Sequence, residues 1–449
     1  MKTRSTLIPL LTPLGALMLA LSLAPALIGA LVVVPMRAMI GLSAGWLALV
    51  AGLMLVEWVR VNRLSRCLHL EARASASVFS AKPFALQLRV WADMNFPLCK
   101  VMLRLDIPEG VRLAQESVGV MLSPQAPYAE HVVQVLPVSR GKVCFERACI
   151  RILTQRALCS FQCEVLLATA LEVTVFPNSN FAAQNVTLVS RGLGERLLDS
   201  GGGEGREFDS LRSYAVGDDL RRVDWKRSAR GTGLQVRVYR PETHQRVSIA
   251  LDCSRRMATR LGDRLLLDVA ADAAAYLTLV ASGNDDEVGL FAFNHEVLCR
   301  HDSRRGKRQE AMIMKELLRL QPGSLEGDYG LITEWARFNR RRSLFVVITS
   351  VSSPASLETL FKTLRPLTKR HLPLVMAIAD RDLQRLAGEK AQDLDDAYVI
   401  ASAVEQLQAI EARVHWLERA GIECVYCDAQ DLGARLHEKY LKLKVSGRL

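Results

Sequence analysis

One stretch of the chain, from Gly205 to Arg230, combines more kinds of charged and aromatic side chain than any other segment. Opposite charges this dense can satisfy one another. The residues there that could do chemistry are Glu207, Phe208, Arg212, Tyr214, Gly217, Asp218, Arg221, Asp224, Trp225, Lys226, Ser228 and Arg230. Such a set can be a binding site for an acidic partner or a phosphate. The interpretation that the sequence favours is an ion-pair network that fixes how two domains meet, because such networks resemble functional sites in sequence.

The same stretch predicts a short helix. Gly217 and Asp218 indicate the end of a loop and a helix N-cap, and Gly231 indicates the stop. This helix would carry cations on one face and turn two apolar side chains inward. The cations are Arg222, Lys226 and Arg230, and the apolar residues are Leu220 and Val223.

An enzymatic alternative uses the same stretch. Asp218, Asp224 and Lys226 could be the catalytic groups of a hydrolase that acts on phosphate or cell-envelope substrates. That hypothesis requires the carboxylates to converge in a pocket with perturbed pKa values. No nucleophile and histidine pairing is recognisable elsewhere, and the chain has no P-loop for ATP hydrolysis.

The pattern G-x-E-F-x-x-L-R-x-Y-x-x-G-D-x-x-R-x-V-x-W-x-x-S-A-R, which spans residues 205–230, resembles the signature of the bacterial family called domain of unknown function 58. The order of segments along nearly the whole chain also resembles that family. The resemblance implies a von Willebrand factor A-like C-terminal domain and a MoxR-type AAA+ ATPase as partner. We therefore expect a membrane-anchored, non-enzymatic adaptor or scaffold that binds proteins at its cytoplasmic face.

The region after residue 240 alternates apolar strands with helices, which predicts a mostly parallel, doubly wound sheet with helices on both faces. Predicted strands include 247–251, 288–293, 344–349, 374–379 and 423–426, and predicted helices include 264–281, 309–320, 331–339, 402–420 and 432–445. In such a sheet the carboxyl ends of the strands form the functional edge.

The first of these strands ends in a sequence that departs from the metal site of von Willebrand A-like domains. That site uses Asp-x-Ser-x-Ser, a Thr and a second Asp to bind Mg²⁺ through oxygen atoms. Asp252 and Ser254 fit the pattern, but Arg256 replaces the second Ser. The loop with Asp328 has no Thr, and the strand that should end in Asp ends in Thr349 and Ser350. We expect no bound Mg²⁺ and no other cofactor.

Two explanations of this degenerate metal-site loop remain open. In one, Arg256 supplies positive charge where relatives use a metal, so that an acidic side chain of a partner can still dock. In the other, the loop is inert and Arg256 pairs with Asp252 or Asp328. A second metal-like motif, Cys424 with Cys427, is favoured as packing, because zinc usually needs a second pair of ligands.

Residues 1–60 predict a transmembrane hairpin with spans at about 7–34 and 38–59, since each apolar run is long enough to cross a bilayer. Basic residues flank both outer ends, and the tip holds only Arg37. Positive charge stays inside, so both termini and the soluble domains are expected in the cytoplasm of a bacterium, anchored in its inner membrane. Ten cysteines without a disulfide pattern agree with that compartment.

The remaining organisation follows from composition. Residues 67–178 alternate with period two between Gly and Pro turns, which predicts an all-β, sandwich-like domain. Residues 179–240 hold the signature, and 241–449 the α/β domain. The net charge is +11 and is scattered among acids, which favours anionic lipid or an acidic protein over nucleic acid. The sequence does not determine the oligomeric state.

Overall fold

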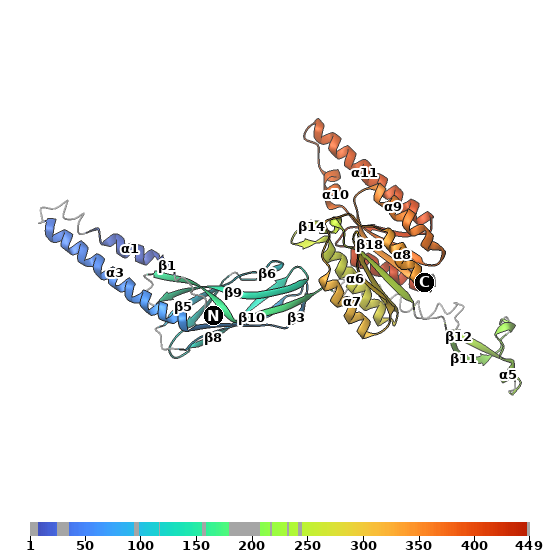
Figure 1. Ribbon diagram of the computed structural model, residues 1–449, viewed down its shortest axis with the longest axis horizontal. Helices are drawn as coiled ribbons and strands as arrows, with labels where there is room; N and C mark the ends of the chain where they lie inside the picture. The colour runs from blue at the N-terminus through green and yellow to red at the C-terminus, as the bar shows by residue number, and fades with distance from the viewer. Residues whose placement is uncertain are drawn as a thin grey trace. The chain divides into compact units, whose positions relative to one another are not determined.

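The computed structural model describes residues 8–24, 36–93, 98–115, 117–154, 159–178, 207–215, 218–230, 233–240 and 245–446. The chain divides into two compact units, Met1–Phe176 and Pro177–Leu449. Figure 1 shows the elements of each unit in ribbon form.

The N-terminal segment only partly follows the predicted membrane hairpin. Its elements are β1 (Ile8–Leu11), α1 (Pro13–Leu21) and α3 (Met36–Cys67). Within the predicted first span, β1 is a strand, and helix begins only at Pro13, where the Thr12 hydroxyl accepts a hydrogen bond from the Gly15 N–H. Proline fits the first helical position because its missing N–H has no helical partner there.

Helix α3 covers the predicted second span and extends past both of its ends. It is one of two helices in the described residues that are long and apolar enough to cross a membrane. In the other, Leu266–Gly283, 78% of the residues are buried in the second unit, whereas 6% are buried in the most apolar 18-residue window of α3. An exposed apolar surface of this kind makes α3 a candidate membrane span. The Trp46 Nε1 of α3 donates to the Met18 carbonyl of α1 at 3.0 Å.

Two β-sheets share one apolar core in the first unit. One has the order β1-β10-β9-β5-β7, with β3 beside β10, and the other β2-β4-β8-β6. Neighbouring strands are antiparallel except for β3 and β10, in agreement with the prediction of antiparallel structure. The strands are β2 (Leu68–Arg73), β3 (Ser77–Phe79), β4 (Phe84–Ala92), β5 (Cys99–Leu105), β6 (Val111–Leu113), β7 (Val118–Leu122), β8 (Tyr128–Pro137), β9 (Gly141–Thr154) and β10 (Cys159–Phe176).

Buried and more exposed side chains alternate along much of these strands, as period-two alternation requires. Strand β5 alternates through its whole length, and Val101 on β5 and Phe145 on β9 are fully buried in the common core. This explains why alternation in the sequence located the strands well.

A six-stranded sheet with the order β17-β16-β13-β18-β19-β20 forms the α/β part of the second unit. All neighbours are parallel except β16 and β17. The strands are β13 (Arg246–Asp252), β16 (Glu287–Phe293), β17 (Val297–Arg304), β18 (Leu344–Val351), β19 (Leu372–Ala379) and β20 (Glu423–Cys427). Every residue of β18 and β19 is buried, because both faces of the sheet are covered.

Helices cover the sheet from two sides, each with its own core (Figure 1). One core contains residues of α6 (Leu266–Gly283), α7 (Lys307–Arg319) and α12 (Leu432–Val445). The other contains residues of α8 (Gly330–Phe338), α9 (Pro354–Leu364) and α11 (Leu394–Arg419). The smaller elements are α10 (Arg381–Gly388), 3₁₀ turns at Arg255–Ala258 and Arg365–Lys369, and the strand pair β14 (Arg260–Leu261) and β15 (Arg264–Leu265).

Of the longer elements of this part, β17, α9 and α10 were not predicted. Strand β17 carries charged residues and lies antiparallel at the sheet edge, so it lacks the continuous apolar run of a central strand. Helix α11 begins at Leu394, earlier than the predicted 402, because the Asp393 carboxylate caps it by accepting from the Asp396 N–H at 2.8 Å.

A buried polar cluster of Asp286, Tyr440 and Lys444 connects helix α12 to the rest of the unit. Asp286, which is fully buried, accepts hydrogen bonds from the Tyr440 hydroxyl and from the Lys444 ammonium, the latter at 2.9 Å. A buried carboxylate costs free energy unless it is paired and hydrogen-bonded. This polar cluster therefore fixes the position of α12 relative to the turn that precedes β16.

Candidate functional site

The signature folds as an antiparallel hairpin of β11 (Glu207–Ser213) and β12 (Gln235–Arg240), with a register shift between Phe208 and Ser210. We call residues 207–240 the signature hairpin. The side chains of Glu207 and Phe208, and the whole of Gly217, lie outside the residues that the structure describes.

The single helix predicted after Asp218 is wrong. Two short elements replace it, a 3₁₀ turn at Leu220–Arg222 and the helix α5 (Trp225–Ser228). Between them Val223 is extended and pairs with Val236 of β12, and these two side chains are 6% and 3% exposed. Val223 thus points inward as predicted. Leu220, however, is 56% exposed, because the helical register that would have turned it inward does not form.

Asp218 is not a helix cap. Its two oxygens accept from both terminal nitrogens of Arg212 at 2.5 and 2.7 Å, and one also accepts from the Ala215 N–H at 2.8 Å. The bond from Arg212 holds the pKa of Asp218 below its ordinary value. Asp219 caps the 3₁₀ turn instead, by accepting from the Arg221 N–H.

Asp224 organises the second half of the hairpin. Its carboxylate caps α5 by accepting from the N–H groups of Lys226 and Arg227 at 3.1 Å, and it also accepts from Arg237 Nε at 3.0 Å. The Arg227 N–H and the Arg237 guanidinium lower the pKa of Asp224. Ser228 Oγ connects the two arms, since it donates to the Asp224 carbonyl and accepts from the Gln235 N–H.

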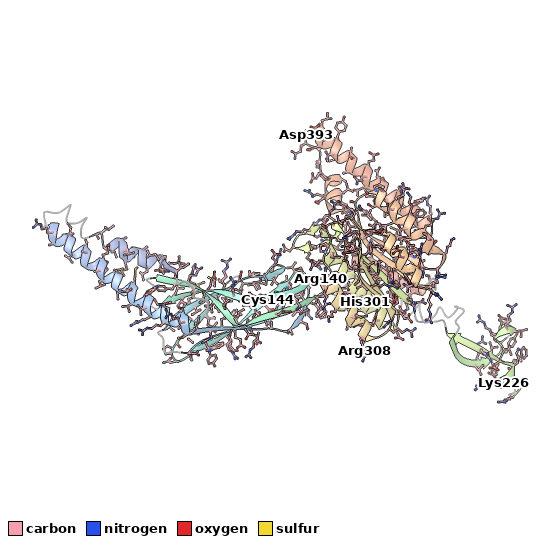
Figure 2. The ribbon with its side chains drawn as sticks, in the orientation of Figure 1. Arg140, Cys144, Lys226, His301, Arg308 and Asp393 are labelled. Atoms are coloured by element: carbon pink, nitrogen blue, oxygen red, sulfur yellow. The ribbon has the colours of Figure 1, made fainter. Side chains whose placement is uncertain are left out.

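The exposed surface around α5 of the signature hairpin is basic and aromatic. The Trp225 side chain is 63% exposed. Five exposed cations surround it in sequence and form no ion pair with any residue in the described parts of the chain: Arg221, Arg222, Lys226, Arg227 and Arg230. Figure 2 labels Lys226, which lies on α5. Tyr214 is half-buried, and its backbone N–H donates to the Leu234 carbonyl at 2.8 Å.

The degenerate metal-site loop lies at the carboxyl end of β13, as predicted. Asp252 is fully buried, and its carboxylate accepts from the Ser254 N–H at 2.7 Å and from Thr349 Oγ1 at 2.6 Å. Burial raises the pKa of Asp252, and the bond from Thr349 opposes that rise. Thr349 Oγ1 also lies 3.0 Å from the hydroxyl of Tyr329, whose pKa burial raises to about 12.

Arg256 pairs with a residue that the sequence did not suggest. Its Nε lies 2.8 Å from an oxygen of Glu326, and its Nη1 donates to Ser356 Oγ at 2.5 Å. The two partners proposed from sequence, Asp252 and Asp328, form no hydrogen bond or ion pair with Arg256 among the described residues. Asp328 is exposed and accepts from the Gly330 N–H instead. Sequence could have indicated Glu326, because it lies in the same loop as Asp328.

The residues present do not make a Mg²⁺ site. The carboxylate of Asp252 is already occupied by two donors, and the Arg256 cation adds positive charge to it. Ser350, near the end of β18, is buried and supplies a hydroxyl where the predicted metal site needs a second carboxylate. The Ser254 hydroxyl is buried without a hydrogen-bond partner in the described chain. One serine hydroxyl and one occupied carboxylate are too few ligands for a hard divalent ion.

The Cys424 and Cys427 pair packs into β20 as expected. Burial raises the pKa of both thiols to about 12, in agreement with a packing role. Among the described residues the groups that could hold a metal do not include either cysteine.

Known proteins resemble parts of this chain. Uncharacterized proteins of Mycobacterium bovis (Mb1516) and Mycobacterium tuberculosis (Rv1480) are each 27% identical over 186 residues, which is 40% of this chain. The chain spans 58% of the length of these relatives.

Two solved structures also match, each over 24% of this chain with a TM-score of 0.16. One is the CARDB domain of a Pyrococcus furiosus protein in complex with di-metal ions, at 15% identity and 91% coverage of that chain. The other is a cohesin module of a Clostridium perfringens family 33 glycoside hydrolase, at 10% identity and 96% coverage. Scores this low carry no argument about fold or function.

The family resemblance read from the signature is supported by a family model that begins inside β11 and ends inside α11. Residues 210–416, from the signature hairpin through most of the α/β part, match the family described as "Protein of unknown function DUF58".

Proposed function

We propose that the protein is a membrane-anchored, non-enzymatic adaptor whose signature hairpin binds an acidic protein partner. One observation carries this proposal. The acidic residues Asp218 and Asp224 are engaged inside the hairpin, and the cations around the exposed Trp225 are left without acidic partners in the described chain.

An exposed tryptophan among arginines is the composition of a binding hot spot. Tryptophan and arginine dominate the energetics of protein interfaces, because they bury large areas and make directed hydrogen bonds. Surplus positive charge also steers an acidic partner toward this surface and accelerates association at low salt. Trp225 with Lys226 and Arg222 would supply both effects.

The hydrolase alternative gains less support from the same geometry. A general acid at neutral pH needs a raised pKa, but hydrogen bonds lower the pKa values of Asp218 and Asp224. Each carboxylate also has fixed structural partners. These contacts favour a structural role for the two carboxylates and a binding role for the cations.

For the partner we propose a MoxR-type AAA+ ATPase, which the family resemblance implies. We also propose that the α/β part is von Willebrand A-like and the β unit sandwich-like. The order of the α/β sheet, numbered along the chain, is 3-2-1-4-5-6, the doubly wound order. In the β unit, two sheets enclose one core.

For the membrane, we propose two passes with both termini and the soluble units in the cytoplasm of the bacterial inner membrane. The long, exposed α3 supports one pass, and the contact between Trp46 and Met18 supports a second segment beside it. An apolar cavity of about 740 Å³ lies between these segments, lined by residues such as Leu21, Leu42 and Leu49. Basic residues after the second span favour the cytoplasmic side.

Affinity capture of the full-length protein from detergent-solubilised native membranes tests the adaptor proposal. We expect the native chain to recover an AAA+ ATPase, and the Trp225→Ala, Lys226→Ala double variant to lose it. Tyr128→Ala is the matched control, since Tyr128 is an aromatic residue of the β unit with 64% exposure. Recovery should also fall as salt is raised.

Equal recovery by the native chain and the double variant would remove the hairpin from partner binding. The hydrolase alternative predicts a different result, in which Asp224→Asn retains the partner and loses turnover of a phosphate or cell-envelope substrate.

A further inference from the structure

Three potential metal ligands meet at the edge of the α/β sheet, away from the degenerate metal-site loop. Cys299 and His301 belong to β17, and Glu316 belongs to α7. Their ligand atoms all lie within 4.8 Å of one another, and each residue is half-buried. The sequence does not indicate this cluster, because Glu316 follows His301 by 15 positions and Cys299 by 17.

The elements dictate this convergence. Residues two apart on a strand point to the same face, so Cys299 and His301 face together, and the buried Ser303 continues that face. On α7, Glu316 precedes the buried Leu317 and follows the buried Ile313 by three positions, which places its side chain at the border of the packed face.

Hydrogen bonds hold the two elements in place around the cluster. Gln309 of α7 donates through Nε2 to the Val288 carbonyl of β16 at 2.9 Å and to the Asp302 carbonyl of β17 at 3.0 Å. Ser303 Oγ lies 3.2 Å from Ser248 Oγ of β13. Rigid elements fix ligand positions better than loops do. His301 is labelled in Figure 2.

The side chains of His301 and Glu316 make no hydrogen bond or ion pair with any other residue described in the structure. Half-buried polar groups in this state are free to bind a ligand, and an imidazole, a thiol and a carboxylate together form a mixed donor set. Zinc accepts all three donor types in tetrahedral sites, where ligand atoms lie about 3.5 Å apart. Small side-chain rotations would bring atoms that lie within 4.8 Å to that separation.

We propose that Cys299, His301 and Glu316 bind one Zn²⁺ ion. Three protein ligands leave the fourth tetrahedral position open to water or to a ligand from a partner protein. The ion would connect the edge strand β17 to α7 and so stabilise a sheet edge that has no further strand beside it among the described residues. This site is independent of the adaptor proposal and of the signature hairpin.

Zinc titration of the detergent-solubilised full-length chain tests the proposal. After treatment with a chelator and a reductant, the native chain should bind one tight Zn²⁺ per chain, measured by competition with a chromophoric chelator. Cys299→Ser, His301→Ala and Glu316→Gln should each weaken that binding by at least about tenfold. Co²⁺ in place of Zn²⁺ should give a thiolate charge-transfer band that Cys299→Ser abolishes.

Two controls separate this site from other thiols and imidazoles. Cys427→Ser and His295→Ala change a cysteine and an exposed histidine outside the cluster, and both should bind zinc as the native chain does. Zinc should raise the melting temperature of the native chain and of the controls, and should leave that of Cys299→Ser unchanged. The proposal is overturned if the native chain binds no tight zinc, or if a folded Cys299→Ser, His301→Ala double variant binds it unchanged.

Discussion

Two tryptophans illustrate how differently the signature hairpin and the α/β part are built. Trp225 on the hairpin is 63% exposed, whereas Trp335 on α8 is 2% exposed. Trp335 stacks on Phe291 with ring centroids 4.8 Å apart and meets Phe345 edge-on at 5.1 Å. Among the hairpin side chains that the structure describes, the buried apolar ones are Val223 and Val236, and Trp225 does not pack against a core.

The pKa values of the central carboxylates shift in opposite directions in the two regions. Asp224 of the hairpin has a lowered pKa, chiefly through the N–H of Arg227. Asp252 of the α/β part has a raised pKa, chiefly through burial. Carboxylates near the surface can therefore stay ionised and organise the chain while nearby cations remain free, whereas a buried carboxylate is bound into the core. Function is expected at the first region and stability at the second.

The largest effect expected from this comparison is on stability. Trp335→Ala removes a fully packed indole and leaves a cavity, so it should lower the free energy of unfolding by about 3–5 kcal/mol. Urea unfolding of the detergent-solubilised chain, followed by circular dichroism, would measure it. A loss below about 1 kcal/mol would mean that the aromatic stack is not a source of stability.

The corresponding tryptophan substitution on the hairpin should change partner affinity more than stability. Trp225→Ala removes an exposed side chain and should change the free energy of unfolding by less than about 0.5 kcal/mol. If Trp225 is a hot spot, partner affinity should fall about 30-fold. Equilibrium binding of the captured partner to both forms would measure the fall. Unaltered affinity together with lost stability would reverse the roles of the two regions.

Asp252 should give the stability of the α/β part a characteristic pH dependence. Its pKa in the folded state is above the ordinary value of 3.8, so the folded chain keeps the proton over a range in which the unfolded chain has lost it. The stabilisation is complete below pH 3.8 and is lost as the pH rises through the folded-state pKa. Asp252→Asn cannot titrate, so its stability relative to the native chain should rise with pH by up to about 1.4 kcal/mol per unit in that window.

Urea unfolding of both chains at several pH values between 4 and 7 would measure this difference. A constant difference across that range would show that Asp252 titrates at its ordinary pKa.

The smallest expected effect is local. Arg212→Ala removes the guanidinium that holds Asp218, whose carboxylate also accepts from the Ala215 N–H. Backbone amides around Ala215 should then exchange with deuterium several-fold faster, while the buried strand β18 keeps its protection. Hydrogen exchange with mass spectrometry resolves the two peptides. Equal exchange in both chains would mean that the Arg212 and Asp218 pair does not order the loop.

Sequence predicted the elements that depend on burial on one or both faces. Strands β13, β18 and β19 are largely apolar runs, and β5 alternates with period two, so their patterns follow directly from how many faces are covered. Helix α12 was predicted with the bounds that it has, Leu432–Val445. Composition could not reveal β17, because an edge strand with one solvent-facing side tolerates the charged sequence Arg300 to Asp302.

The errors at the candidate sites have a common physical cause. Asp218 was expected to cap a helix, but a bidentate bond to Arg212 competes for the same oxygens. Val223 was expected within a helix, but pairing with Val236 gives it an extended backbone. Glu326 binds Arg256 from a distant part of the chain. Each outcome depends on a partner that local sequence rules do not consider.

The polar cluster of Asp286, Tyr440 and Lys444 affects when the α/β part can complete its folding during synthesis. The side chains of Leu432, Leu436 and Tyr440 are fully buried and complete one face of the sheet. A ribosome synthesises all six strands before it reaches α12, and until then the part of this apolar face that α12 covers is exposed, and Asp286 has neither the Tyr440 hydroxyl nor Lys444 as a partner. The nascent α/β part therefore stays incomplete, and dependent on protection from aggregation, until translation has passed Lys444.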